Sequence, residues 1–257
     1  MGQAEKLDMW PTILDCRWPD LASPYASALQ DAVAHILDRF PVLGIIASGS
    51  IIRGNPGPTS DFDLYVIHAQ PQRQRLQRLF RGVPAEIFVN PPHTIRSYFA
   101  SEHNAGRPCT AHMFVTGFPI LASDPVVAEL CEEARTWLQK APTVMEQKLL
   151  WRRYGIVDLL DNARDLLESD PECAARFLHQ AVDGMVDYRF LSNGHFFPRP
   201  KEALTKLAEL DPEVAQVIRV YYQTSNVQIQ AQLADTLARR ILGVTAFFEW
   251  ESEPETV

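Results

Sequence analysis

The pattern of apolar and polar residues divides the chain into two halves. In the first half, short apolar runs bounded by glycine, proline or asparagine predict strands, and apolar positions spaced three and four apart predict helices. Strands are expected over 42–47, 62–67, 85–89 and 118–121. Helices are expected over 24–39, 71–81, 93–116 with a break near 106–108, and 124–139, of which 71–81 is arginine-rich and should be exposed.

From residue 143 onward the apolar positions follow a helical period throughout. Asp170-Pro171 and Asp211-Pro212 each place an N-cap aspartate before proline at the first helical position. Helices are expected over 143–168, 171–191, 200–208, 211–224 and 226–249. With a boundary at Ala141-Pro142, the chain is predicted to be α/β plus α: a domain at 1–141 with a small mixed sheet, then a helical bundle at 142–257.

Composition and charge narrow the classes of function. The 257 residues are 46% apolar, as in ordinary globular proteins, and carry a formal net charge of −8. Residues 142–257 contribute 12 basic and 18 acidic side chains, so most of the excess negative charge lies in the second half. An acidic chain argues against a broad nucleic-acid groove and is compatible with a small cationic partner.

Cysteine usage and the start of the chain predict a cytoplasmic protein. Cys16, Cys109, Cys131 and Cys173 show neither zinc-ligand spacing nor a disulfide framework. The first residues lack the basic and apolar regions of a secretory signal. Apolar stretches all fall short of the roughly 20 residues of a membrane span, so no membrane partner is expected.

The stretch 49–63, between two predicted strands, contains residues that suit a phosphate and a divalent cation. Gly49 and Ser50 follow the first strand, where free backbone N–H groups and a serine hydroxyl suit a phosphate. Asp61 and Asp63 stand one residue apart at the next strand, so their carboxylates share a face and favour a hard divalent cation. Each half alone is common in ordinary turns and strand starts. Their ordered combination indicates nucleotide chemistry.

This order resembles the signature of the DNA polymerase beta-like nucleotidyltransferase superfamily. The resemblance is strongest over 40–90 and implies that Gly49, Ser50, Asp61 and Asp63 bind a triphosphate and two magnesium ions. ATP or another nucleoside triphosphate is then the expected substrate. Within the superfamily, the chain is most similar to aminoglycoside adenylyltransferases acting on streptomycin and spectinomycin.

Glu86 is the single acidic residue of the predicted strand 85–89. A lone carboxylate among apolar residues ordinarily faces solvent. The resemblance implies instead a third carboxylate of the site, either the base that activates the acceptor hydroxyl or a third metal ligand. His112, beside Ala111 and Met113, is interpreted as a core residue.

Further nucleotide-binding residues follow from the resemblance. Ser60 corresponds to a serine of the triphosphate site, although a turn serine is its ordinary role. Arg53 lies one turn after Ser50, where it would reach the terminal phosphates or remain a surface residue. Lys201, which follows Pro200 at a helix start, corresponds to a lysine that reaches the phosphates from the second domain. Either Tyr221 or Tyr222 corresponds to a tyrosine near the nucleotide.

The predicted activity is transfer of a nucleoside monophosphate, AMP by resemblance, from a magnesium-bound triphosphate to a hydroxyl of a small molecule. An aminoglycoside-like acceptor is one hypothesis. Adenylylation of a protein or RNA partner is an alternative. A regulatory module that binds nucleotide without turnover is another, against which the presence of three carboxylates argues. The acceptor, the base preference and the oligomeric state stay open.

Overall fold

A computed structural model describes residues 10–143 and 145–254 of the chain. It divides into two compact units, Met1–Lys140 and Ala141–Val257. This division lies one residue before the boundary expected from the sequence, and the independence of the two domains stays a prediction. The residues on which the absence of a secretory signal depended, 1–9, lie outside the described part.

One mixed sheet forms the centre of the first unit. Its strands are β1 (Val42–Ser48), β2 (Phe62–His68), β3 (Gln74–Phe80), β4 (Val83–Asn90) and β5 (Phe118–Ala122). They are ordered β3-β4-β2-β1-β5. β1 is antiparallel to β2 and β5, β3 is antiparallel to β4, and β2 and β4 are parallel. The expected small mixed sheet is therefore confirmed.

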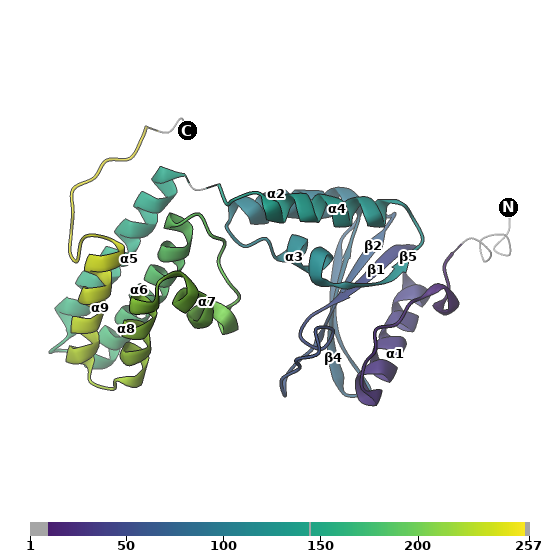
Figure 1. Cartoon of the computed structure of the whole chain (residues 1–257), viewed down its shortest axis with the longest axis horizontal. Helices are drawn as coiled ribbons and strands as arrows, with labels where there is room; N and C mark the ends of the chain where they lie inside the picture. Colours follow the sequence, from purple (N-terminus) through teal and green to yellow (C-terminus); the bar gives the residue numbers. More distant parts are fainter. Residues whose placement is uncertain (1–9, 144, 255–257) are drawn as a thin grey trace. The chain divides into compact units, whose positions relative to one another are not determined.

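Helices cover both faces of this sheet (Figure 1). They are α1 (Ser23–Arg39), α2 (Pro92–Asn104), α3 (Cys109–Thr116) and α4 (Val126–Gln139), preceded by a short 3-10 helix η1 (Ile13–Asp15). Because strand side chains alternate, Leu64 packs with α1 on one face, whereas its neighbour Tyr65 packs with α2, α3 and α4 on the other. The break expected near 106–108 separates α2 from α3, and Gly106 has a positive φ of 78° there.

Residues 74–80 of the segment 71–81 form the strand β3, and the predicted exposed helix is wrong. Arg81 and Gly82 have φ values of 49° and 82°, which form a two-residue hairpin turn between β3 and β4. β3 is an edge strand, so its polar side chains remain largely exposed and give no apolar alternation. Pairing with β4, rather than intrinsic propensity, decides its conformation.

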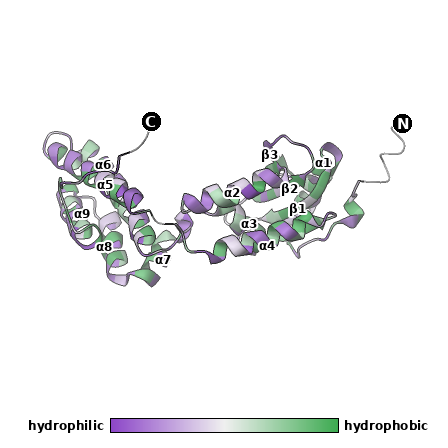
Figure 2. Cartoon of the chain, turned by 90° about the horizontal axis from the view of Figure 1, so that it is seen from above, coloured by the Kyte–Doolittle hydropathy of each residue, from purple (hydrophilic) through white to green (hydrophobic). Residues whose placement is uncertain are grey.

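The second unit is helical. Its helices are α5 (Glu146–Leu166), α6 (Pro171–Ser192), α7 (Ala203–Leu210), α8 (Pro212–Gln223) and α9 (Val227–Ile241), with a 3-10 helix η2 (Pro200–Glu202) before α7. The two predicted caps are confirmed, because Asp170 and Asp211 each accept a hydrogen bond from a backbone N–H three residues on. Hydropathy along these helices alternates between hydrophilic and hydrophobic residues (Figure 2), and their apolar positions form one core.

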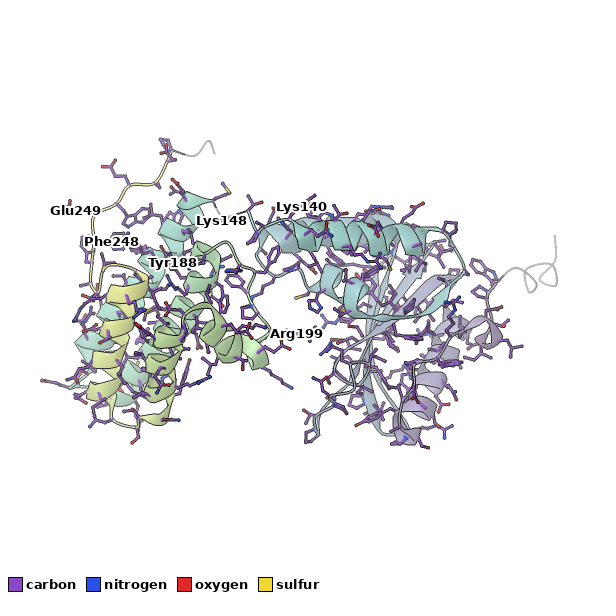
Figure 3. All side chains as sticks on the ribbon, in the orientation of Figure 1. Lys140, Lys148, Tyr188, Arg199, Phe248 and Glu249 are labelled. Carbon is purple, nitrogen blue, oxygen red and sulfur yellow. The ribbon has the colours of Figure 1, made fainter. Side chains whose placement is uncertain are left out.

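The last helix ends earlier than predicted. Helix 226–249 was expected, but α9 ends at Ile241 because Gly243 has a positive φ of 73°, typical of a helix terminus. The chain beyond it is irregular and packs against α5, where the Arg153 guanidinium lies 4.6 Å from the Phe248 ring centroid. Figure 3 labels Phe248 in this segment. None of the helices in the described ranges is long and apolar enough to cross a lipid bilayer.

His68, at the end of β2, gives a pH-dependent contribution to stability. Its Nε2 lies 2.8 Å from the Gln72 carbonyl oxygen, its Nδ1 is buried, and burial lowers the pKa of the imidazole below the ordinary 6.5. The unfolded chain therefore binds the proton at higher pH than the folded protein, and the free energy of unfolding should fall as pH drops below 6.5.

Replacing the imidazole with a neutral amide tests this contribution. We expect His68→Gln to show a shallower fall in the free energy of unfolding between about pH 7 and pH 5, the range in which histidine titrates. Urea unfolding at a series of pH values measures the slope. Equal slopes in the two proteins would mean that His68 does not contribute.

Candidate functional site

Strand register sets four polar side chains in one row across the sheet. Ser48 on β1 pairs with Asp63 on β2, and Asp63 pairs with Glu86 on β4. Gln77 on β3 pairs with Glu86 and completes the row. Paired residues point to the same face of a sheet. The row therefore places Glu86 beside the aspartates, on the side expected from the sequence.

Three carboxylates converge at this row. One oxygen from each of Asp61, Asp63 and Glu86 lies within 4.8 Å of the other two, and all three side chains are half-buried. Oxygen ligands at such spacing are what Mg²⁺ and similar hard cations prefer, and a cation would relieve the repulsion among three like charges. The donor set therefore fits a divalent cation, and the residues that would hold it are these three.

The turn after β1 brings the predicted phosphate-binding residues together. Gly49 has a φ of 100°, which a residue with a side chain rarely adopts, and the turn is closed by a bond from the Asn55 N–H to the Ser50 carbonyl oxygen at 3.0 Å. Ser50 Oγ lies 2.5 Å from Ser60 Oγ, so the two serines meet across the loop. Ser60 also accepts from the Gly57 N–H at 2.8 Å.

Gly49 is required by geometry as well as by φ. A Cβ there would lie 3.1 Å from the Asp61 carbonyl oxygen and 3.2 Å from Asp63 Oδ2. We expect Gly49→Ala to lower the free energy of unfolding by about 1–3 kcal/mol and to weaken divalent-cation binding, because Asp63 must shift. Chemical unfolding and Mn²⁺ titration measure the two effects.

Gly54→Ala is the matched control for that change. Gly54 also has a positive φ, 77°, but a Cβ there meets nothing within 4 Å. The control should share the backbone strain and retain cation binding. Equal cation affinity in the two variants would show that Gly49 does not position Asp63.

Glu86 is held by two side chains of β3 that were not predicted from the sequence. Arg75 donates to Glu86 Oε1 from Nε at 2.8 Å and again from Nη2, and Gln77 Nε2 donates to the same oxygen at 3.0 Å. The pair is partly exposed, with 64% of the Arg75 side chain and 15% of the Glu86 side chain accessible. It therefore adds little stability, and its effect is to orient the carboxylate. The glycine of the hairpin turn at Gly82 was the signal that could have revealed this strand.

Other predicted residues are placed but not brought into this cluster by a described contact. Arg53 is exposed in the loop after Ser50, and Lys201 is exposed in η2 of the second unit. Tyr221 is buried with its hydroxyl 3.2 Å from His179 Nδ1, whereas Tyr222 is 42% exposed and donates to Asp183. Their roles toward a nucleotide stay predictions.

Two cavities adjoin the row along β4. The carboxylate cavity, of about 440 Å³, is lined by Asp61 and Glu86 together with residues of β3 and β4. The aromatic cavity, of about 550 Å³, lies between β2, β3 and β4 on one side and α2 and α3 on the other. Its walls include Tyr65, Arg73, Arg75, Phe88, Tyr98 and Glu102.

The chain is similar to known proteins in two comparisons. Among solved structures, a nucleotidyltransferase-like protein from Exiguobacterium sibiricum 255-15 is similar, with 14% identity and a TM-score of 0.49; the match covers 79% of this chain and 69% of that chain. No curated protein matches the chain significantly. Residues 31–110 match the family model described as "Nucleotidyltransferase domain". That range contains the Gly-Ser turn and all three carboxylates, so the match to a nucleotidyltransferase domain includes the candidate site.

Proposed function

We propose that the protein transfers a nucleoside monophosphate from a nucleoside triphosphate to a hydroxyl group of a small molecule, with Mg²⁺ as the metal. The convergence of Asp61, Asp63 and Glu86 within 4.8 Å carries the proposal. The family match over 31–110 supports nucleotidyl transfer in general. Two metal ions, AMP as the transferred group and the residue roles below are parts of the same proposal.

Each side chain has a task that its position permits. Ser50 and Ser60, whose hydroxyls meet at 2.5 Å, bind the phosphates beside the start of the turn at Gly49. Asp61 and Asp63 hold the metal, and Glu86 completes the ligand set or accepts the proton of the acceptor hydroxyl. A bound Mg²⁺ supplies charge neutralisation for the triphosphate and its leaving group. Arg53 and Lys201 are proposed to add positive charge at the terminal phosphates.

The reaction is a substitution at phosphorus. The acceptor oxygen forms a bond to the α-phosphate, the bond between the α-phosphate and its bridging oxygen breaks, and pyrophosphate leaves. The hydroxyl proton passes to Glu86 or to water. Attack and departure must be roughly in line, so acceptor and pyrophosphate lie on opposite sides of the α-phosphate.

Pyrophosphate release tests the proposed activity. Each of the four nucleoside triphosphates is supplied with Mg²⁺ and a panel of hydroxylated small molecules, with and without EDTA. We expect release that needs both acceptor and metal, and that is fastest with ATP. Nucleotide binding without release under any condition would contradict catalysis on small molecules and favour a binding module, and labelling of a protein or RNA by radioactive ATP would favour the macromolecular alternative.

A further inference from the structure

The aromatic cavity begins one residue pair beyond the carboxylates. Asp63 pairs with Glu86, and the next pair on the same face is Tyr65 with Phe88. Two residues along a strand span about 7 Å. Tyr65 and Phe88 line the cavity. A molecule of modest size bound there therefore reaches the carboxylate row.

Arg75 joins the two cavities. Its side chain lines the aromatic cavity, where the guanidinium lies 4.8 Å from the Phe88 ring centroid. The same guanidinium donates to Glu86, which lines the carboxylate cavity. The ion pair of Arg75 and Glu86 therefore has one member in the wall of each cavity, and a bound group that passes Arg75 meets Glu86.

Strand order places the aromatic cavity on the side of the site suited to an acceptor. The Gly-Ser turn follows β1, whereas the cavity adjoins β4 and β3, which lie on the other side of β2 in the sheet. Phosphates at Ser50 and an acceptor beside Glu86 are then on opposite sides of Asp63. Opposite placement is what in-line attack on the α-phosphate requires.

The walls offer apolar contact to the body of a ligand. The Tyr65 and Phe88 rings stack with centroids 5.7 Å apart and an interplanar angle of 16°, and the Arg75 guanidinium lies over the Phe88 ring, so these rings are already packed against neighbours. Met113 of α3 and Tyr98 of α2 also line the cavity. Apolar parts of a ligand gain free energy when such walls remove them from water.

The charges of the cavity favour an anion. Arg73 Nη1 donates to the Tyr98 hydroxyl at 2.5 Å, a neutral partner, and within residues 10–143 and 145–254 its guanidinium makes no ion pair. Glu102, the acidic residue of the wall, is already bonded by the Thr110 N–H at 2.6 Å and hydroxyl at 2.7 Å. Burial also raises the pKa of that carboxyl. Arg73 is therefore the charged group left for a ligand.

We propose that the aromatic cavity binds the acceptor, and that the acceptor is a molecule with an apolar body, a hydroxyl group and an anionic group. The apolar body packs against the walls of the cavity, the anionic group meets Arg73, and the hydroxyl points past Arg75 toward Glu86. This inference rests on the proposed function and names its substrate class. It favours an acceptor different from the cationic, aminoglycoside-like one considered from the net charge.

A series of probes that share one shape and differ in charge tests the proposal. The probes are para-(hydroxymethyl)benzoate, its neutral amide and the cationic para-(hydroxymethyl)benzylamine, titrated into the protein by NMR in the presence of Mg²⁺ and a non-hydrolysable ATP analogue. We expect the carboxylate to bind best. Arg73→Gln should weaken it about tenfold, the loss expected for one charge-assisted contact. Arg135→Gln, the same charge change on an exposed pair of α4, should leave it unchanged.

A separate measurement of ATP-analogue binding distinguishes failure of the acceptor assignment from failure of the proposed nucleotidyl transfer. If the analogue binds with Mg²⁺ but no probe binds, or the amine binds best, or Arg73→Gln has no effect, the acceptor assignment is overturned and nucleotidyl transfer stands. If the carboxylate competes with the analogue, or Arg73→Gln weakens the analogue as well, the cavity holds the nucleotide base and the assignment is again overturned. If the analogue does not bind, the proposed function itself fails.

Discussion

Asp63→Asn is expected to lower the rate of nucleotidyl transfer by on the order of 10³-fold, about 4 kcal/mol of transition-state stabilisation. Asp63 is central to the row because it pairs with both Ser48 and Glu86 and belongs to the three-carboxylate cluster. Asparagine keeps the shape and removes the charge that a divalent cation requires. Pyrophosphate release under saturating triphosphate measures the loss, and circular dichroism verifies the fold.

Asp38→Asn provides the control for net charge. Asp38 is exposed on α1, outside the three-carboxylate cluster, and its replacement by asparagine should leave the rate unchanged. A rate for Asp63→Asn within about threefold of the unmodified protein, less than 1 kcal/mol, would exclude Asp63 from the chemistry.

Gly117→Ala is expected to reduce the free energy of unfolding by about 3 kcal/mol or more. Gly117 follows α3, and a Cβ there would lie 2.4 Å from the Met113 carbonyl oxygen and 2.9 Å from the Ala47 carbonyl oxygen. Both are backbone atoms, so no side-chain rotation relieves the overlap. The turn that joins α3 to β5 would have to move away from β1, the strand that leads into the Gly-Ser turn.

Gly57→Ala distinguishes this overlap from a general effect of removing glycine. At Gly57 a Cβ would have Ser60 Oγ as its nearest neighbour, at 3.9 Å, which is ordinary contact. Urea unfolding should show a change below about 1 kcal/mol for this variant. Similar losses for the two variants would mean that the close approach of Gly117 to β1 does not limit stability.

The sequence was sufficient for the parts of the site that lie on buried strands. The apolar runs of β1 and β2 are buried on both faces, and β4 alternates between buried and more accessible residues, so hydrophobicity alone was enough to predict all three strands. Alternation then set Asp61 and Asp63 on one face. Which face of the sheet Glu86 shares depended on how β4 pairs with β2. The structure shows that these strands are parallel and that Glu86 pairs with Asp63.

The sequence pattern did not predict the edge strand of the sheet. Residues 74–80 are mostly exposed, and their apolar members Leu76, Leu79 and Phe80 do not alternate with polar residues as in a strand. The sequence therefore predicted a helix, which gave no reason to expect Arg75 and Gln77 as partners of Glu86. The aromatic cavity was hidden for another reason. Its walls come from β2, β3, β4, α2 and α3, and Tyr65 and Tyr98 meet across long sequence separations that local patterns do not encode.

The net charge of the chain and the local charges of the cavity predict different acceptors. The overall charge of −8 is dominated by the second half of the chain, whereas the cavity beside Glu86 carries two arginines and one carboxylate that is already bonded. Over distances beyond about 10 Å, exposed charges are screened, so the side chains that line a site outweigh the total. A small molecule is selected by those local groups.

Metal-dependent nucleotide binding tests the central claim most directly. Calorimetric titration of a non-hydrolysable ATP analogue, with Mn²⁺ and then with EDTA, compares the unmodified protein with Asp63→Asn. We predict one nucleotide bound in the presence of Mn²⁺, at least tenfold weaker binding in EDTA, and equally weak binding in the variant with metal. Equal affinity in EDTA and Mn²⁺, or full affinity in Asp63→Asn, would contradict a metal–nucleotide site at Asp61, Asp63 and Glu86.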